Sequence, residues 1–222
     1  PFANRDPRLK AYILVNGDKM GSTDGVVNSA ADSKTTDGLN KENGKSTRTG
    51  YYLRKLLRSD INLNPNSTTK QKHLNARIRS TEILLDYAEA ANEAQGPKAN
   101  VGGANYSAYD VIKAIRERAG IGEFGEDPYL EECAQSKEKM RELIRNERRL
   151  ELCFENHRFW DLRRWKANLN EAAKGINITT DEATGAFVYK TFEAEERKYD
   201  DYMFYGPIPY SEILKYSNLK QN

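Results

Sequence analysis

The chain has 222 residues, with 35 lysines and arginines, 33 aspartates and glutamates, and 38% hydrophobic residues. That length suffices for one large domain or two small ones, and the composition is that of a globular protein. There is no run of about eighteen apolar residues, so the sequence predicts no transmembrane helix. The net charge of +2 comes from interspersed acids and bases, which argues against nucleic acid as a partner.

Loops are expected to dominate the first quarter of the chain. Residues 4–15 read as a short extended or mixed element that contains Pro7, and AYILV at 11–15 is typical of a strand. Residues 16–50 are rich in Gly, Ser, Thr, Asn and Asp, which is loop composition. A loop of this length in a compact domain is usually functional or disordered. An apolar pattern resumes at Tyr51–Leu57.

Two amphipathic helices are predicted next. Apolar residues recur at helical spacing from Ala76 onward, and Gly96–Pro97 is suited to end that helix. After a glycine-rich connector, Ser107 is suited to cap a second helix and Gly120 to end it. Such a helical pair must pack together, because neither helix could bury its apolar face alone. Residues 121–135 are expected to be a connector.

Residues 144–165, IRNERRLELCFENHRFWDLRRW, combine six arginines, four acidic residues and two tryptophans. Ser136 is suited to begin the helix that leads into this segment. The apolar line of that helix is predicted to comprise Met140, Leu143, Ile144, Leu150 and Phe154. Glu147 and Glu151 fall on or beside the line at four-residue steps. A second short helix is expected near His157–Lys166.

The paired carboxylates Glu147 and Glu151 invite a catalytic interpretation, because paired acids perform acid–base chemistry when their environments differ. The neighbouring arginines favour the ionised form of both carboxylates and therefore a structural role. These arginines are Arg145, Arg148, Arg149, Arg158, Arg163 and Arg164. Binding of phosphate groups by the arginines is disfavoured by the interleaved acids. We predict a network of ion pairs that joins several helices, with arginines stacked on tryptophan.

No metal site is predicted. A di-iron type of helical bundle requires Glu-x-x-His, whereas Glu155 and His157 are only two residues apart. A zinc site would need both histidines and both cysteines, and their spacing fits no zinc pattern. Cys133 and Cys153 could instead form a disulfide or remain two buried thiols.

The last quarter of the chain is expected to contain a hairpin around Gly185, followed by YMFYGPIPYSEI at 202–213. This stretch should be extended and fixed by its prolines before a short terminal helix. The chain begins at Pro1 without a charged or apolar leader, which is typical of the interior of a longer protein. The whole reads as mainly helical, with long loops and small strands.

Residues 144–165 resemble the signature of the SusD/RagB-like proteins of Bacteroidetes. Three further segments agree in the same order: NRDPRL at 4–9, STEILLDYAEAANEA at 80–94 followed by AYDVIKAIRERAG, and YGPIPYSEI at 205–213 with NLKQN at 218–222. This sequence departs from the family pattern at a few positions. Cys153 and Asn156 stand where Ala and Gly are usual, Gly206 interrupts the aromatic-Pro-Ile-Pro run, and Tyr216–Ser217 replaces a common Asn-Pro. They bear on local turn geometry.

The resemblance implies a mainly α fold, a tetratricopeptide-like superhelix with long loops and small β elements. It implies that residues 1–222 are the C-terminal portion of a SusD/RagB-like domain, without the family's lipidated N-terminal half. The implied protein is a lipoprotein on the extracellular face of the outer membrane, attached only through that lipid. It captures a glycan or another nutrient, delivers it to a SusC-like TonB-dependent transporter, and has neither catalytic activity nor cofactor.

Sugar sites place aromatic rings against pyranose faces and polar side chains against hydroxyl groups. Because loops tend to carry function, we predict the ligand-binding residues from the loops. They are Asn40, Asn43, Tyr51, Tyr52, Tyr106 and Tyr109. Trp160 and Trp165 would suit a sugar site by type, but their place inside the charged segment assigns them to the core network.

Two other functions remain open from the sequence. A peptide-binding helical-repeat adaptor would show a groove lined by Asn and Lys or Arg rather than by aromatic rings. A glycoside hydrolase would place two carboxyl groups across an open cleft. The closely paired carboxylates of this sequence lie among arginines instead.

Overall fold

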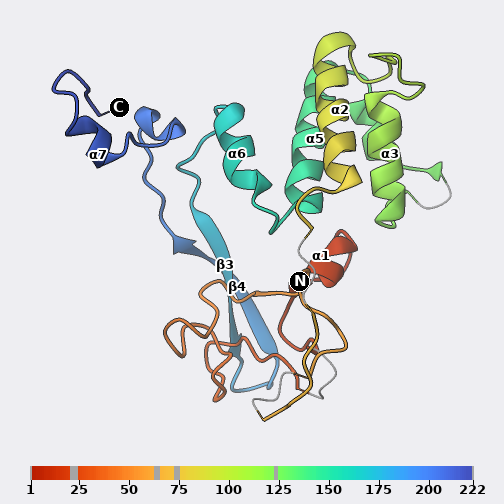
Figure 1. Cartoon of the computed structure of the whole chain (residues 1–222). Coiled ribbons are helices and arrows are strands. Elements are labelled where there is room, and N and C mark those ends of the chain that lie inside the picture. Colours follow the sequence, from red (N-terminus) through yellow and green to blue (C-terminus); the bar gives the residue numbers. More distant parts are fainter. Residues whose placement is uncertain (1, 21–24, 63–65, 73–75, 123–124, 222) are drawn as a thin grey trace.

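The computed structural model describes residues 2–20, 25–62, 66–72, 76–122 and 125–221. A helical bundle and a loop-rich β-hairpin region form the two main parts (Figure 1). The bundle consists of α2 (Ser80–Gln95), α3 (Ala108–Arg118), α4 (Pro128–Cys133) and α5 (Lys137–Glu151). Among the described residues, no helix is both long enough and apolar enough to cross a membrane. The predicted mainly α class is confirmed.

Helices α2 and α3 form the predicted pair, and α2 also packs on α5. Ser107 begins α3 with a capping box: its Oγ accepts from the Asp110 amide at 3.2 Å, and Asp110 accepts from the Ser107 amide at 2.8 Å. The helix ends at Ala119, and Gly120 follows with φ of 80°. Both predicted ends are confirmed, because each depends on chemistry local to the chain.

Helix α4 contradicts the expectation that residues 121–135 are only a connector. Asp127 caps this helix by accepting from the Leu130 amide at 3.1 Å, and Pro128 occupies the first turn. Leu130 and Cys133 are buried in the bundle. A short helix therefore forms where the composition indicated a loop, because Asp-Pro is a good helix start and two apolar residues can be buried.

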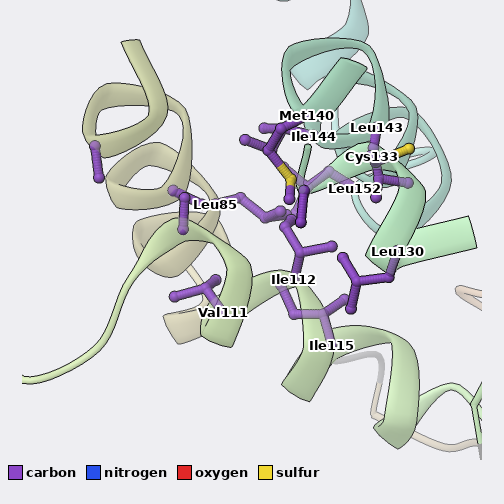
Figure 2. Close-up of a cluster of buried hydrophobic side chains, with 14 residues drawn as sticks. Leu85, Val111, Ile112, Ile115, Leu130, Cys133, Met140, Leu143, Ile144 and Leu152 are labelled. Carbon is purple, nitrogen blue, oxygen red and sulfur yellow. The ribbon is translucent and has the colours of Figure 1, made fainter. Parts of the chain in front are cut away.

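The bundle core is one continuous cluster of buried apolar side chains from α2, α3, α4 and α5 (Figure 2). In α5, Met140, Leu143 and Ile144 are buried as predicted. Leu150 is only half-buried and lines a cleft, and Phe154 lies beyond the end of α5 at Glu151, where helical spacing no longer applies. Leu152 enters the core instead, and Phe154 is 46% exposed.

The N-terminal segment is helical before it becomes extended. Helix α1 (Arg8–Tyr12) is followed by β1 (Ile13–Leu14), which pairs with β2 (Tyr52–Leu53). The predicted strand at 11–15 is therefore only two residues long. Pro7 restricts the residue before it, but its own fixed φ suits the start of a helix.

Strands β3 (Ala173–Thr180) and β4 (Phe187–Glu195) form the predicted antiparallel hairpin. The long loop at 16–50 lies beside it (Figure 1) and bonds to β3. The amide of Ala31 donates to the Ile178 carbonyl at 2.8 Å. A second, small core at this contact contains Ala30, Ile176 and Ile178, with Phe2, Tyr51 and Tyr189 packed against it.

Helix α6 (His157–Arg164) packs on α5, close to its expected bounds. The stretch at 202–213 is only partly as predicted, because η2 (Asp201–Phe204) is a 3-10 turn. An extended segment and α7 (Tyr210–Ile213) follow it, as expected. Cys133 and Cys153 are free thiols, and His73 lies outside the described residues.

Candidate ligand-binding site

The two carboxylates on α5 are buried among arginines from other segments, Glu147 with 0% and Glu151 with 1% of its surface exposed. Glu147 accepts from Arg8 Nη1 at 2.8 Å and from Arg116 Nη1 at 2.9 Å. Glu151 accepts from Arg118 Nη2 at 2.5 Å. We call these five residues the charged clasp. The clasp joins α1, α3 and α5, as a structural network should.

The predicted partners within this network are wrong. Within the described residues, the arginines of 144–165 form no ion pair with Glu147 or Glu151, because neighbours on one helix point in different directions. Arg148 binds Asp161 at 3.0 Å and also pairs with Asp86. The network is therefore real, but its cations come from residues far away in the sequence.

The two tryptophans of the segment have different roles. Trp165 Nε1 donates to Glu89 at 2.7 Å, and its ring lies 4.9 Å from the guanidinium of Arg145 and 4.8 Å from that of Arg164. Trp165 therefore belongs to the network as predicted. Trp160 is 65% exposed on α6, so its assignment to the core was wrong.

Lys55 and Arg79 bind the C-terminal end of α5. Lys55 Nζ donates to the carbonyls of Glu151 at 2.6 Å and Cys153 at 3.1 Å. Arg79 Nη2 donates to the same Glu151 carbonyl at 3.0 Å. Both cations also bind Glu155; burial raises the pKa of this carboxyl, but the two cations hold it below its usual range. Cations at a helix C-terminus also satisfy its free carbonyls. These contacts hold the chain after β2 against α5.

An open cleft of about 830 Å³ lies beside this contact. It is lined by residues of α1, β2, the β3–β4 hairpin and the end of α5. Its aromatic lining consists of Phe2, Tyr12, Tyr51, Tyr52, Phe154 and Tyr189. The ring of Phe2 meets those of Tyr51 and Tyr189 edge-on, with centroids 6.3 and 5.7 Å apart. We call this feature the aromatic cleft.

A close approach of two backbones positions the cleft tyrosines. The Thr49 carbonyl accepts from the Ile176 amide at 2.8 Å. Gly50 has φ of 81°, and a Cβ there would lie 2.2 Å from the Ile176 carbonyl oxygen. Only glycine combines this conformation with this contact. The loop therefore rests directly on β3 just before Tyr51 and Tyr52.

Tyr51 and Tyr52 both line the aromatic cleft, but their hydroxyl groups differ. Tyr52 Oη donates to the Asp37 carbonyl and accepts from the Thr47 amide, both at 2.9 Å. Tyr52 therefore holds the loop in place. No hydrogen bond joins the Tyr51 hydroxyl to the described part of the chain, and burial raises its pKa. Tyr51 is thus the better placed to bond a ligand.

The other four predicted residues lie elsewhere. Asn40 and Asn43 are exposed on the loop and do not line the aromatic cleft. Tyr106 lies in the connector between α2 and α3 and Tyr109 in the first turn of α3, and neither lines the aromatic cleft. The Tyr109 hydroxyl bonds to Glu131, which raises the pKa of Tyr109 to about 12. The structure therefore brings together two of the six residues.

Four aromatic cleft residues were not among the predicted site residues: Phe2, Tyr12, Phe154 and Tyr189. Phe154 was placed in the core by extending helical spacing past the end of α5. Its φ is 64° and that of Asn156 is 68°, so the junction of α5 and α6 turns sharply. Strained backbone of this kind often occurs at functional sites. The alternation along β4 could have indicated Tyr189, whereas nothing local indicated Phe2.

A second hollow of about 490 Å³ lies near the C-terminus. It is lined by residues 166–170 and by Tyr199, Phe204 and Tyr205, together with two aspartates. Its aromatic residues are fewer, and the loop at 16–50 takes no part in it. The aromatic cleft is therefore the better candidate for a ligand.

The helical bundle and the aromatic cleft place this chain in the class of mainly helical proteins with an open, aromatic-lined cleft. A model of the SusD family matches residues 1–222, so the chain belongs to the SusD family. SusD-like protein P2 of Formosa agariphila is 30% identical over 145 residues, which are 65% of this chain and 24% of that protein. The crystal structure of a SusD-like protein from Bacteroides fragilis aligns with a TM-score of 0.73 and 28% identity.

The alignment to the Bacteroides fragilis structure covers 100% of this chain and 39% of that one. The resemblance inferred from the sequence motifs is thereby confirmed. The chain spans well under half the length of both relatives, 24% of one and 39% of the other.

Proposed function

We propose that this chain is the glycan-contacting portion of a nutrient-binding lipoprotein on the outer face of the outer membrane. In this proposal a lipid anchor lies outside the chain, and the captured ligand passes to a SusC-like TonB-dependent transporter. Membership of the SusD family supports the general role. The aromatic cleft is the observation that carries the proposal for this part of the molecule.

The chemistry of the cleft suits a saccharide. Rings with their faces open to a cavity can pack against the apolar faces of sugars, and hydroxyl groups bind at their edges. The cleft volume of about 830 Å³ lies within the usual range for ligand pockets. The Tyr51 hydroxyl and the Thr191 side chain supply hydrogen-bonding groups at its lining.

The carboxyl groups at the aromatic cleft favour binding of a glycan over its hydrolysis. A glycosidase needs two carboxyl groups on either side of the bond to be cleaved, about 5–10 Å apart. Among the described residues that line the cleft, Asp6 is the single acid, and Arg8 binds both of its oxygens. The alternative of a peptide adaptor predicted a groove lined by Asn and Lys or Arg rather than by aromatic rings. The described cleft lining contains arginine and lysine, but it has no asparagine and six aromatic side chains.

Calorimetric titration of a panel of oligosaccharides tests the site. For a ligand bound by the natural chain, Tyr51→Ala and Tyr189→Ala should each weaken affinity about tenfold or more, as expected for a stacking anchor. Tyr205→Ala, which alters the second hollow, is the matched control and should leave affinity unchanged. Unchanged affinity in folded Tyr51→Ala and Tyr189→Ala proteins would refute the aromatic cleft as the site.

Delivery to a transporter needs a separate experiment. The full-length protein, tagged and extracted from native membranes, should co-purify with a TonB-dependent transporter. Deleting that transporter should abolish growth on the bound glycan while leaving surface capture of the glycan intact. Growth without the transporter would contradict the delivery step, though not glycan binding in the aromatic cleft.

A further inference from the structure

The charged residues that line the aromatic cleft are mainly cations. They are Arg5, Asp6, Arg8, Arg149 and Lys174. Arg8 binds Asp6 through two hydrogen bonds, from Nε at 3.0 Å and from Nη2 at 2.6 Å, and it also pairs with Glu147 in the charged clasp. Two further cations, Arg149 and Lys174, also line the cleft. The chain as a whole has nearly equal numbers of acids and bases, 33 and 35, so this is a local excess.

Arg149 and Lys174 come from different walls of the cleft, helix α5 and strand β3. Both side chains are exposed, and neither forms an ion pair with a residue in the described ranges. Glu193 lies across the ladder from Lys174, but the two are not within ion-pair distance and Glu193 does not line the cleft. Unpaired cations at an aromatic cavity would complement an anionic ligand.

The surroundings of Arg149 strengthen the local positive potential. Burial, together with the charge of Arg149, lowers the pKa of the nearby Arg158 guanidinium. Arg197 acts in the same direction, and the carboxylates of Glu171 and Asp161 do not reverse the effect. Cations that repel one another in this way gain from an added anion, because it relieves the repulsion.

We propose that the aromatic cleft selects an acidic saccharide, whose carboxylate or sulfate groups bind Arg149 and Lys174 while its rings pack on the cleft aromatics. The inference rests on the proposed function, since it assumes that glycans bind in this cleft. It adds the ligand class: a polysaccharide with regularly spaced acid groups can contact α5 and β3 together. Guanidinium and ammonium groups both bind such oxyanions strongly.

Chemically matched ligand pairs test this selectivity. Oligogalacturonate and its methyl ester share one backbone and differ in carboxylate charge, and a sulfated oligosaccharide and its desulfated form differ in sulfate charge. In calorimetry, one acidic form should bind at least about tenfold more tightly than its neutral partner. If oligogalacturonate binds, the site recognises carboxylate groups; if the sulfated oligosaccharide binds, it recognises sulfate groups. Its advantage should shrink between about 0.05 and 0.5 M NaCl, as charge screening requires.

Charge-removing variants locate the effect. Lys174→Gln and Arg149→Gln should each weaken the acidic ligand several-fold more than the neutral ligand, so that the preference for the acidic form shrinks. Lys190→Gln is the matched control, because Lys190 is exposed on β4 between Tyr189 and Thr191, which line the cleft. Alternation along a strand directs its side chain to the other face. Lys190→Gln should therefore change neither affinity, and thermal melting should show that all three variants fold.

The outcomes separate this inference from the proposed function. Equal binding of charged and neutral partners, with loss of both in Tyr51→Ala, would overturn acid selectivity and leave glycan binding intact. Tighter acidic binding that Lys174→Gln and Arg149→Gln do not reduce would also overturn the inference. Failure of both the charged and the neutral series to bind, or binding that no cleft variant alters, would count against both proposals.

Discussion

Arg8 Nη1 lies 2.8 Å from Glu147 Oε2, although the two residues are 139 positions apart in the chain. Both side chains are buried, and the second oxygen of Glu147 binds Arg116 of α3. Arg8 also lines the aromatic cleft and binds Asp6. One guanidinium thus connects the interior of the bundle to the wall of the candidate site, where Asp6 also holds it.

Glu147→Gln should reduce the free energy of unfolding by about 3 kcal/mol, the lower end for a broken buried ion pair, because Arg8 and Arg116 lose their shared anion but keep Asp6 and Asp127. Urea denaturation measures the loss. Arg141→Gln, which breaks the more exposed pair with Glu93, is the control and should cost far less. Affinity of the surviving folded Glu147→Gln protein for its glycan should not change, since Glu147 does not line the cleft. Selective loss of binding with unchanged stability would contradict the structural role.

Trp165→Phe should lower the free energy of unfolding by about 1–3 kcal/mol. It removes the hydrogen bond to the Glu89 carboxylate and weakens the contact with two arginines. Trp160→Phe makes the same chemical change at an exposed position of α6 and should alter stability by less than about 0.5 kcal/mol. Similar effects of both substitutions in thermal and chemical denaturation would show that Trp165 has no special place in the network.

Acid should destabilise the fold through Asp6 and Glu155. Burial raises the pKa of each carboxyl, but Arg8 beside Asp6, and Arg79 and Lys55 beside Glu155, hold both pKa values below the usual 3.8 and 4.5. The unfolded chain therefore binds more protons than the folded chain in this range. These two groups contribute fully to the free energy of unfolding above their ordinary pKa values. The contribution is lost as pH falls through the lowered pKa values of the folded chain.

Urea denaturation between about pH 3 and pH 7 measures this dependence. Stability should decline with acidification below about pH 4.5, and the decline should be shallower in Glu155→Gln because one titrating group is gone. Glu182→Gln is the control, since Glu182 is exposed in the β-hairpin turn and forms no ion pair with the described residues. A Glu155→Gln profile parallel to that of the natural chain would show that Glu155 does not link folding to pH.

Sequence reasoning succeeded where the determining contacts are local. Ser107 and Gly120 set the ends of α3 through their own backbone neighbours, and the turn at Gly185 closes the hairpin within a few residues. The family motifs were also readable, because they are contiguous segments. The left-handed conformation of Asn156 agrees with the expectation that this position, usually glycine in the family, concerns local turn geometry.

Sequence reasoning failed where contacts join distant segments. The burial of Glu147 was predicted, but its partner Arg8 could not be identified, because helical spacing says nothing about which other segment faces a helix. Extending that spacing past Glu151 misplaced Phe154, since the end of α5 depends on Lys55 and Arg79 binding its last carbonyls. The aromatic cleft likewise combines four separate segments. The sequence indicated Tyr51 and Tyr52, which follow the long loop, and the alternation along β4 could have added Tyr189.

Gly50→Ala should destabilise the protein more than Gly44→Ala. Both glycines belong to the same loop and have left-handed backbones, with φ of 81° and 75°, so alanine incurs at both positions a conformational cost of about 1–2 kcal/mol. A Cβ at Gly44 meets open space, whereas one at Gly50 would lie 2.2 Å from the Ile176 carbonyl oxygen. The difference between the variants in urea denaturation therefore isolates the contact between the loop and β3.

Displacement of the loop from β3 at Gly50 should also affect glycan binding, because Tyr51 and Tyr52 directly follow Gly50 and line the aromatic cleft. Gly50→Ala should therefore weaken glycan affinity in the folded protein, whereas Gly44→Ala should lower stability with affinity unchanged. Calorimetry below the melting temperature of both variants separates the two effects. Equal stability losses with equal affinities would mean that the loop can leave β3 without cost, and that the close approach at Ile176 does not position the tyrosines.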